Sequence, residues 1–320
     1  MSLAYDALRV FVNWQRERRL NKVRERKQAA RKATGLLAGG GGYFDVGGQS
    51  LGIRVDGSIA CWGLNYRGQA PPDGVPGNFV AIAAGERHSL ALRVDGSIAC
   101  WGLNNRGQAP PDGVLGNFVA IVAGAGHSLA LRVDGSIACW GYSRFGRAPP
   151  DGVPGNFVAI AAGEDHSLAI RVDGSIACWG RNGRGQAPPD GVPGNFVAIA
   201  AGAQHSLALR VDGSIACWGY NFNGQAPPDG VEGDFVAIAA GGGHSLALRR
   251  DGSVACWGNN DDGRAPPAGV PGNFVAIAAG NAHSLALGAD GSVACWGRNS
   301  RGEAPPAGVS GPFRVTQADL

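Results

Sequence analysis

Short apolar segments alternate with turns rich in glycine and proline along most of the chain, and the whole pattern repeats every 39 residues. The unit from Phe79 to Asn117 is representative. It begins with small and β-branched residues at 79–84, and residues 88–94 then alternate apolar with small or polar side chains. Short segments of this kind predict β-strands.

The rest of the unit predicts two more strands. Asp95-Gly96 is a hairpin signal, because glycine adopts the positive φ that tight hairpins require. Residues 97–102 predict a third strand, on which Trp101 packs between units and has one indole N–H to satisfy. Residues 108–111, Gln-Ala-Pro-Pro, predict a fourth strand at the outer rim, since proline lacks the amide N–H that an interior strand donates.

Seven such units predict an all-β fold, a seven-bladed β-propeller of four-stranded antiparallel blades, because radial closure removes exposed ends. We assign residues 39–320 to this propeller. By register the first strand of unit one falls at 40–46, where the apolar pattern is lost, whereas residues 313–318 return to the phase of a first strand. We therefore expect the C-terminal strand to complete the first blade and close the ring.

Three motifs recur in phase through residues 47–313: Ala-Gly-x-x-His-Ser-Leu-Ala-Leu, Asp-Gly, and Trp-Gly-x-Asn-x-x-Gly-Gln. They resemble the repeat of the regulator of chromosome condensation family, and the resemblance implies a propeller. Some members of that family are nucleotide-exchange factors for small GTPases, others are modules of ubiquitin ligases or signalling proteins, and related bacterial propellers cap and inhibit enzymes. The resemblance therefore predicts fold better than function.

Differences among the units are concentrated in two places, the pair after Ala-Gly and the four residues after Trp-Gly. In an up-and-down blade both loops lie on one face, whereas the Asp-Gly hairpins and the Pro-Pro linkers of the other face barely change. Varied loops on a constant scaffold indicate a binding surface. The alternative is that turn chemistry on the constant face tolerates less change.

Aromatic and arginine residues, which are enriched in interface hot spots, gather in the variable loops of units three to five, and unit six adds an acidic border. The predicted partner-binding residues are Tyr66, Arg67, Arg106, Tyr142, Arg144, Phe145, Arg181, Arg184, Tyr220, Phe222, Asp261 and Asp262. We expect a monomeric, non-catalytic scaffold that binds a protein partner through this face. The alternative is a guanine-nucleotide exchange or regulatory factor for a small GTPase, with a basic tail on nucleic acid or chromatin, although the uniform units carry no inserted wedge.

Two rings of equivalent residues invite a chemical interpretation. Six units carry a histidine where unit one has Gln49, and residues spread around a propeller are too far apart to share one metal ion. Gln49 favours hydrogen bonding at this position instead. The seven cysteines, one per unit, stand about 10 Å apart if blades pack like sheets, beyond the ~7 Å between Cα atoms that a disulfide allows. We expect free thiols in a reducing compartment, no metal, no cofactor and no catalytic site.

Residues 1–38 differ in character from the repeats. Leu3, Ala7, Val10 and Trp14 fall at helical spacing, and residues 1–35 carry ten Lys/Arg against three Asp/Glu, whereas the remainder carries eighteen against twenty-two. An amphipathic helix followed by a basic tail is expected. The residues predicted to contact an anionic partner are Arg16, Arg18, Arg19, Lys22, Arg24, Arg26, Lys27, Arg31 and Lys32.

The role of this segment has several interpretations. Nucleic acid or an anionic membrane would attract its charge, a helix packed on the propeller would need no ligand, and an organelle-targeting segment is disfavoured by Glu17 and Glu25. No apolar run reaches 18 residues and no secretory signal is recognisable. We expect a soluble protein of the cytoplasm, or of the nucleus in a eukaryote.

Overall fold

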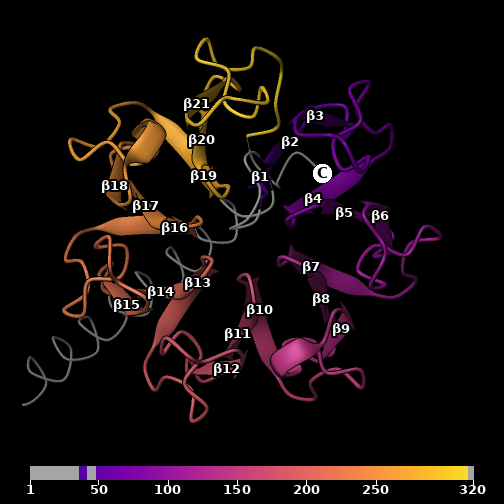
Figure 1. Cartoon of the computed structure of the whole chain (residues 1–320), viewed down its shortest axis with the longest axis vertical. Coiled ribbons are helices and arrows are strands. Elements are labelled where there is room, and N and C mark those ends of the chain that lie inside the picture. Colours follow the sequence, from indigo (N-terminus) through magenta and orange to yellow (C-terminus); the bar gives the residue numbers. More distant parts are fainter. Residues whose placement is uncertain (1–35, 42–47, 316–320) are drawn as a thin grey trace, which may run out of the picture.

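The computed structural model describes residues 36–41 and 48–315, which form seven separate three-stranded sheets arranged around one axis (Figure 1). The innermost strands are β1 (Leu37–Gly39), β4 (Phe79–Ala84), β7 (Phe118–Ala123), β10 (Phe157–Ala162), β13 (Phe196–Ala201), β16 (Phe235–Ala240) and β19 (Phe274–Ala279). The middle strands are β2 (Gln49–Ile53), β5 (His88–Arg93), β8 (His127–Arg132), β11 (His166–Arg171), β14 (His205–Arg210), β17 (His244–Arg249) and β20 (His283–Gly288). The outer strands are β3 (Ile59–Gly63), β6 (Ile98–Gly102), β9 (Ile137–Gly141), β12 (Ile176–Gly180), β15 (Ile215–Gly219), β18 (Val254–Gly258) and β21 (Val293–Gly297).

The hydrophobic core lies between neighbouring blades. Leu90 and Ile98 of the second blade are fully buried and belong to one cluster with Phe118 and Ile121 of the third blade. Alanines alternate with the larger side chains, which lets adjacent sheets approach closely. Each blade therefore depends on its neighbour for burial, as expected of a repeat whose single unit cannot cover its own apolar faces.

The prediction of four-stranded blades is wrong, because each blade has three strands. Residues 108–111 form no strand; Gly113 N–H donates instead to the carbonyl of Pro110 at 2.9 Å, which closes a turn. The outer edge is held only at one point, where Ile98 and Val114 exchange two backbone hydrogen bonds of 2.9 Å. Two adjacent prolines offer no N–H, so the ladder cannot extend along this segment.

Both ends of the described chain meet at the first blade. Its innermost strand is β1, at Leu37–Gly39 rather than at the predicted 40–46. Gly40 is equivalent to Gly85, because Gly40 N–H donates to the carbonyl of Gln49 as Gly85 N–H does to that of His88. More residues separate Gly40 from Gln49 than separate Gly85 from His88, and this difference shifts the register. Phe313 bridges Arg54, and its ring lies 6.2 Å from that of Trp62. β1 and the C-terminal segment thus share the place that one strand fills in the other blades.

Arg314, which departs from the apolar pattern of the other units, is buried at this junction. Its guanidinium donates to the carbonyl of Phe79 at 3.1 Å and to that of Val55 at 3.4 Å. The polar residue is therefore accommodated by hydrogen bonds to the backbone rather than by apolar packing.

The helical part of the expected fold lies in a segment that the structure does not describe. The described residues contain no α-helix, only two 3₁₀ turns, η1 (Arg144–Gly146) and η2 (Asp261–Gly263), and none of their elements is long and apolar enough to be a membrane-spanning helix. The predicted N-terminal helix and its basic residues fall within 1–35, outside the described residues. The described residues form the propeller.

A belt of side-chain hydrogen bonds joins each blade to the next. Trp101 Nε1 and Ser89 Oγ both donate to the carbonyl of Gln69 in the preceding unit, each at 2.9 Å. The same two bonds recur in every unit, ending with Trp62 and Ser50 on the carbonyl of Glu303. The expectation that tryptophan packs between blades and satisfies its N–H there is confirmed.

The histidines complete this belt. His88 Nε2 lies 2.9 Å from Ser128 Oγ of the following unit, and the other five histidines make the same contact, with His283 reaching Ser50 across the closure. Gln49 takes the place of a histidine in unit one and donates to the carbonyls of Gly85 and His88. Hydrogen bonding is thus confirmed as the role of the ring, and all seven cysteines are free.

Candidate functional site

The two variable loops of each unit lie side by side at one end of the blade. Leu103 N–H donates to the carbonyl of Arg87, and Arg181 N–H donates to that of Asp165, each at 2.8 Å. These bonds join the residue after Trp-Gly to the residue before the histidine, so the varied positions of a unit form one surface. The same bond recurs from unit to unit, which places all the variable loops on one face of the ring.

Arginine and aromatic side chains on this face are stacked across blade boundaries. The guanidinium carbon of Arg106, in unit two, lies 4.8 Å from the ring centre of Tyr142 in unit three, and that of Arg147 lies 4.5 Å from the same ring. Tyr142 is therefore held between two cations that come from neighbouring units. Such cation–π contacts fix both partners and are strongest where water is partly excluded.

The row continues into units four and five. Phe145, nearly half exposed, has Arg144 at 4.7 Å and Arg181 of unit four at 5.5 Å from its ring centre. Arg184 of unit four then lies 5.1 Å from the ring of Tyr220 in unit five. Tyr220 stacks on Phe222, whose side chain is 83% exposed. We call this set, from Arg106 to Phe222, the arginine–aromatic row.

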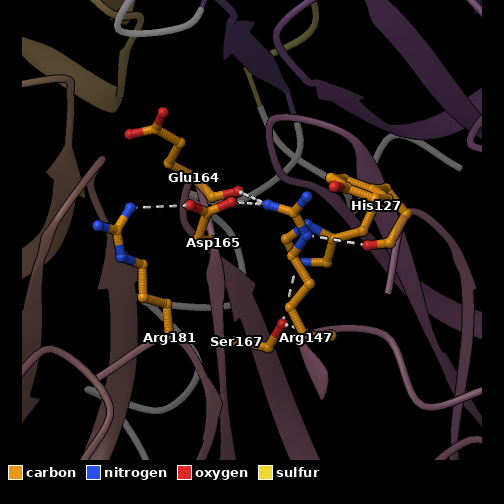
Figure 2. Close-up of polar contacts among 7 residues, drawn as sticks. His127, Arg147, Glu164, Asp165, Ser167 and Arg181 are labelled. Carbon is orange, nitrogen blue, oxygen red and sulfur yellow. Dashed lines mark hydrogen bonds and ion pairs between the residues drawn. The ribbon is translucent and has the colours of Figure 1, made fainter. Parts of the chain in front are cut away.

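Arg147 lies beside Glu164 and Asp165, and Asp165 separates it from Arg181 (Figure 2). The Arg147 side chain is buried, donates from Nε to the carbonyl of Tyr142 at 2.9 Å and from Nη1 to that of Glu164 at 3.0 Å, and forms an ion pair with Asp165. Asp165 also faces Arg181 at 3.4 Å. One carboxylate thus binds two arginines from two blades and links the variable loops of units three and four.

Burial shifts the ionisation of this cluster. Burial raises the pKa of Glu164 above its ordinary value, while the charges of Arg181 and Arg147 partly oppose the shift. Burial likewise lowers the pKa of Arg147, although an arginine stays protonated at any physiological pH. Glu164 and Asp165 are the acidic groups of units three and four on this face, against Arg144, Arg147, Arg181 and Arg184.

The other predicted partner-binding residues lie outside this row. Tyr66 is half exposed, with the guanidinium carbon of Arg67 at 5.4 Å from its ring centre and that of Arg87 at 5.8 Å. Asp262 in unit six pairs with Arg264 at 2.8 Å, and Asp261 accepts a hydrogen bond from Asn259. The acidic border is thus partly neutralised by its own unit.

Sequence reasoning missed Arg147, which contacts Tyr142, Glu164 and Asp165. A signal was present, because units three and six carry arginine where five units carry glutamine or glutamate. Comparing that position across units would have marked it as distinctive.

Two further features of the described residues bear on chemistry. These residues contain no group of three or more histidine, cysteine or acidic residues that could hold a metal ion. The central channel, of about 740 Å³, is lined mainly by alanine, valine, isoleucine and glycine of the innermost strands. Glu86, Glu164, Arg171 and Asn281 also line it.

Comparison with known proteins identifies the repeat. A sequence model described as the regulator of chromosome condensation (RCC1) repeat matches six segments, residues 79–108, 118–147, 157–186, 196–225, 235–264 and 274–303. A comparison with curated protein sequences finds no match.

Many solved structures share the fold. The ectodomain of the Arabidopsis thaliana receptor kinase ACR4 is 24% identical, with a TM-score of 0.66 over 86% of this chain and 99% of that one. The Physcomitrella patens receptor kinase CR4 ectodomain is 25% identical, with a TM-score of 0.66 over 82% of this chain and 72% of that one. Prp20p from Saccharomyces cerevisiae is 21% identical, with a TM-score of 0.63 over 80% and 84%.

Proposed function

Because the chain belongs to the regulator of chromosome condensation (RCC1) repeat family, we propose that it is a non-catalytic scaffold that binds a partner protein through its variable loop face. The observation that carries this proposal is the arginine–aromatic row, which spans four consecutive units with one arginine–aromatic contact across each blade boundary. Arginine, tyrosine and phenylalanine held in place by neighbours lose little freedom on binding, which is what interface hot spots require.

Charge indicates the kind of partner. On this face, units two to four carry six arginines against three carboxylates, although residues 36–320 as a whole carry eighteen basic and twenty-two acidic side chains. A basic sector on a mildly acidic body selects a partner surface that combines carboxylates with apolar groups, because complementary potential speeds encounter and excludes other partners. Prp20p, described as binding Gsp1p and histones, supports the view that propellers of this fold bind proteins.

The test is affinity capture from native lysate with three baits. These are the full chain, residues 36–320, and a full chain in which the loops after Trp-Gly in units three to five are replaced by that of unit two. Loss of a partner with the loop replacement alone would support the proposal. Loss only on removal of residues 1–35 would contradict it and assign recognition to the basic segment, with nucleic acid or anionic membrane as its ligand.

A matched pair of charge reversals then tests the row itself. Arg184 and Arg301 occupy the same loop position, in units four and seven, and each donates its backbone N–H to the side chain two residues later. Only Arg184 belongs to the row. We expect R184E to weaken partner binding at least tenfold and R301E to change it less than twofold.

Equal effects of R184E and R301E would contradict the proposed surface. Acceleration of nucleotide release by the chain across a panel of small GTPases would instead favour the exchange-factor alternative, and the same two variants would show whether this face is used.

A further inference from the structure

The loop after Trp-Gly adopts two conformations among the seven units. Phe145 and Asp262 have φ values of 64° and 62°, and they are the described non-glycine residues with positive φ. They occupy the same position, two residues before Arg147 and Arg264, within the two 3₁₀ turns η1 and η2. A bulky side chain such as phenylalanine rarely adopts this left-handed conformation, so something in units three and six must hold it.

The residue that differs between the two groups of units is the one after the loop glycine. In five units it is glutamine or glutamate, and its buried side-chain oxygen accepts the backbone N–H of the residue two positions earlier. These bonds, of 2.7–2.9 Å, join Gln69 to Arg67, Gln108 to Arg106, Gln186 to Arg184, Gln225 to Asn223 and Glu303 to Arg301. An acceptor placed there fixes the loop in its ordinary, negative-φ form.

Arginine reverses this chemistry because it donates hydrogen bonds and accepts none. Arg147 Nε donates to the carbonyl of Tyr142, and Arg264 Nε donates to that of Asp261 at 2.8 Å. The N–H of the residue two positions earlier loses its acceptor, while a loop carbonyl gains a donor. The loop therefore has the positive-φ conformation in the two units that carry arginine. It does not have it in the five units that carry glutamine or glutamate.

In unit three this rearrangement builds part of the arginine–aromatic row. Phe145, at the left-handed position, lies between Arg144 and Arg181, and the same Arg147 guanidinium holds Glu164 and Asp165 of unit four. Arg147 is itself 3% exposed, so it is too buried to form much of a partner contact.

We infer that the residue after the loop glycine selects the loop conformation of each blade, and that Arg147 is a positioning residue that presents Phe145 and Asp165 for binding. The first half concerns the fold alone. The second half rests on the proposed function, and the two halves are tested separately.

Glycine and alanine at position 145 report the loop conformation without any partner. Where φ is positive, glycine is less strained than alanine; where φ is negative, alanine is the more stable because it restricts the unfolded chain. With Arg147 present, we expect F145G to melt about 2 °C above F145A. With R147Q the order should reverse, and with R147K, which also lacks an acceptor, it should not.

Unit six provides the matched control, since D262G and D262A should show the same reversal when R264Q is introduced. If glycine and alanine keep the same order at both positions whichever residue follows the loop glycine, the loop's own sequence sets its shape and the inference is wrong. That result needs no partner, so it is independent of whether the proposed function holds.

The partner recovered by the full-chain bait tests the second half. R147Q should weaken its binding at least tenfold, R147K should restore part of that loss, and R264Q should leave binding within twofold. Unchanged binding by R147Q would show that Arg147 does not position the site, even if the substitution changes the φ of Phe145 from positive to negative.

Discussion

Acidification should unfold this protein in a pH window set by its ring of histidines. Each serine Oγ in the belt donates to a carbonyl of the preceding unit, so the histidine Nε2 that contacts it must carry the proton. Nδ1 of five of these rings is buried without a hydrogen-bond partner. A second ring proton would therefore point into a site without an acceptor, and burial lowers the pKa of His88, His205 and His283 from 6.5 to about 4 and that of His166 to about 3.

The sign and size of the effect follow from proton linkage. Below pH 6.5 the unfolded chain binds a proton at each histidine, whereas the folded chain stays neutral there until about pH 4. Stability is therefore complete above pH 6.5 and falls as the pH falls through this window, by about 1.4 kcal/mol per pH unit for each histidine. Burial also lowers the pKa of His127 and His244, so six groups give about 8 kcal/mol per pH unit. The free energy of unfolding of a domain is about 5–15 kcal/mol. Unfolding near pH 5 is expected.

The turn aspartates act in a different window. Hydrogen bonds from the side chain and backbone of Ser97 lower the pKa of Asp95 below 3.8, and its equivalents in the other units have the same partners. Their contribution is lost only as the pH falls below about 4. Loss of stability between pH 6.5 and 4.5 therefore reports the histidines.

Urea unfolding followed by tryptophan fluorescence from pH 8 to 4.5, with refolding at pH 8 as the reversibility check, measures this slope. H205Q is the matched variant, because Gln49 already fills the equivalent place in unit one. It should remove one of six titrating groups and reduce the slope by about one sixth. A free energy of unfolding that changes by less than about 1 kcal/mol between pH 7 and 5 would refute the reasoning.

Three further outcomes are expected. Burial raises the pKa of Cys139 to about 12, as it does for the other six thiols. At pH 8 a thiol-exchange reagent should therefore react with the native chain over 100-fold more slowly than with the urea-unfolded chain. Seven fast-reacting thiols in the native chain would contradict this. F313A, at the closure, should cost about 3 kcal/mol by urea unfolding, and a cost below about 1 kcal/mol would show that the C-terminal segment does not hold the ring. W101F should cost about 1–2 kcal/mol by the same assay, because it removes the bond to the Gln69 carbonyl, and a neutral W101F would contradict the role of the belt.

The repeat made most of the blade predictable. Strands at 79–84, 88–93 and 98–102, the Asp95-Gly96 hairpin and the interblade Trp101 all follow from local pattern and turn chemistry. The prediction of a fourth strand was wrong because a proline-containing segment can lie along the edge of a sheet without pairing with it. One bridge at Val114 is what remains once the prolines remove the donors.

The first blade was harder to predict because its register is set by contacts far apart in sequence. Counting back 39 residues placed its inner strand at 40–46, whereas Leu37 packs in the core with the unit-seven strands and Phe313, and Ala38 packs with Phe79 of unit two. Residues inserted after Gly40 broke the count. Which residues of the variable face meet across blades was likewise beyond local pattern, since Arg106 contacts Tyr142 only because adjacent blades bring their loops together.

The structure also explains why the variable loops can differ while the blades do not. The tryptophan and serine bonds of the belt end on a backbone carbonyl, as with Trp101 and Ser89 on Gln69, so they do not depend on the side chain at that position. Replacement of Gln by Arg147 leaves them intact, with Trp179 and Ser167 on the Arg147 carbonyl at 3.0 Å. The side chain of this one residue is therefore free to select the loop conformation above it, while its backbone keeps the ring together. A change in the variable face consequently requires little change in the blade itself.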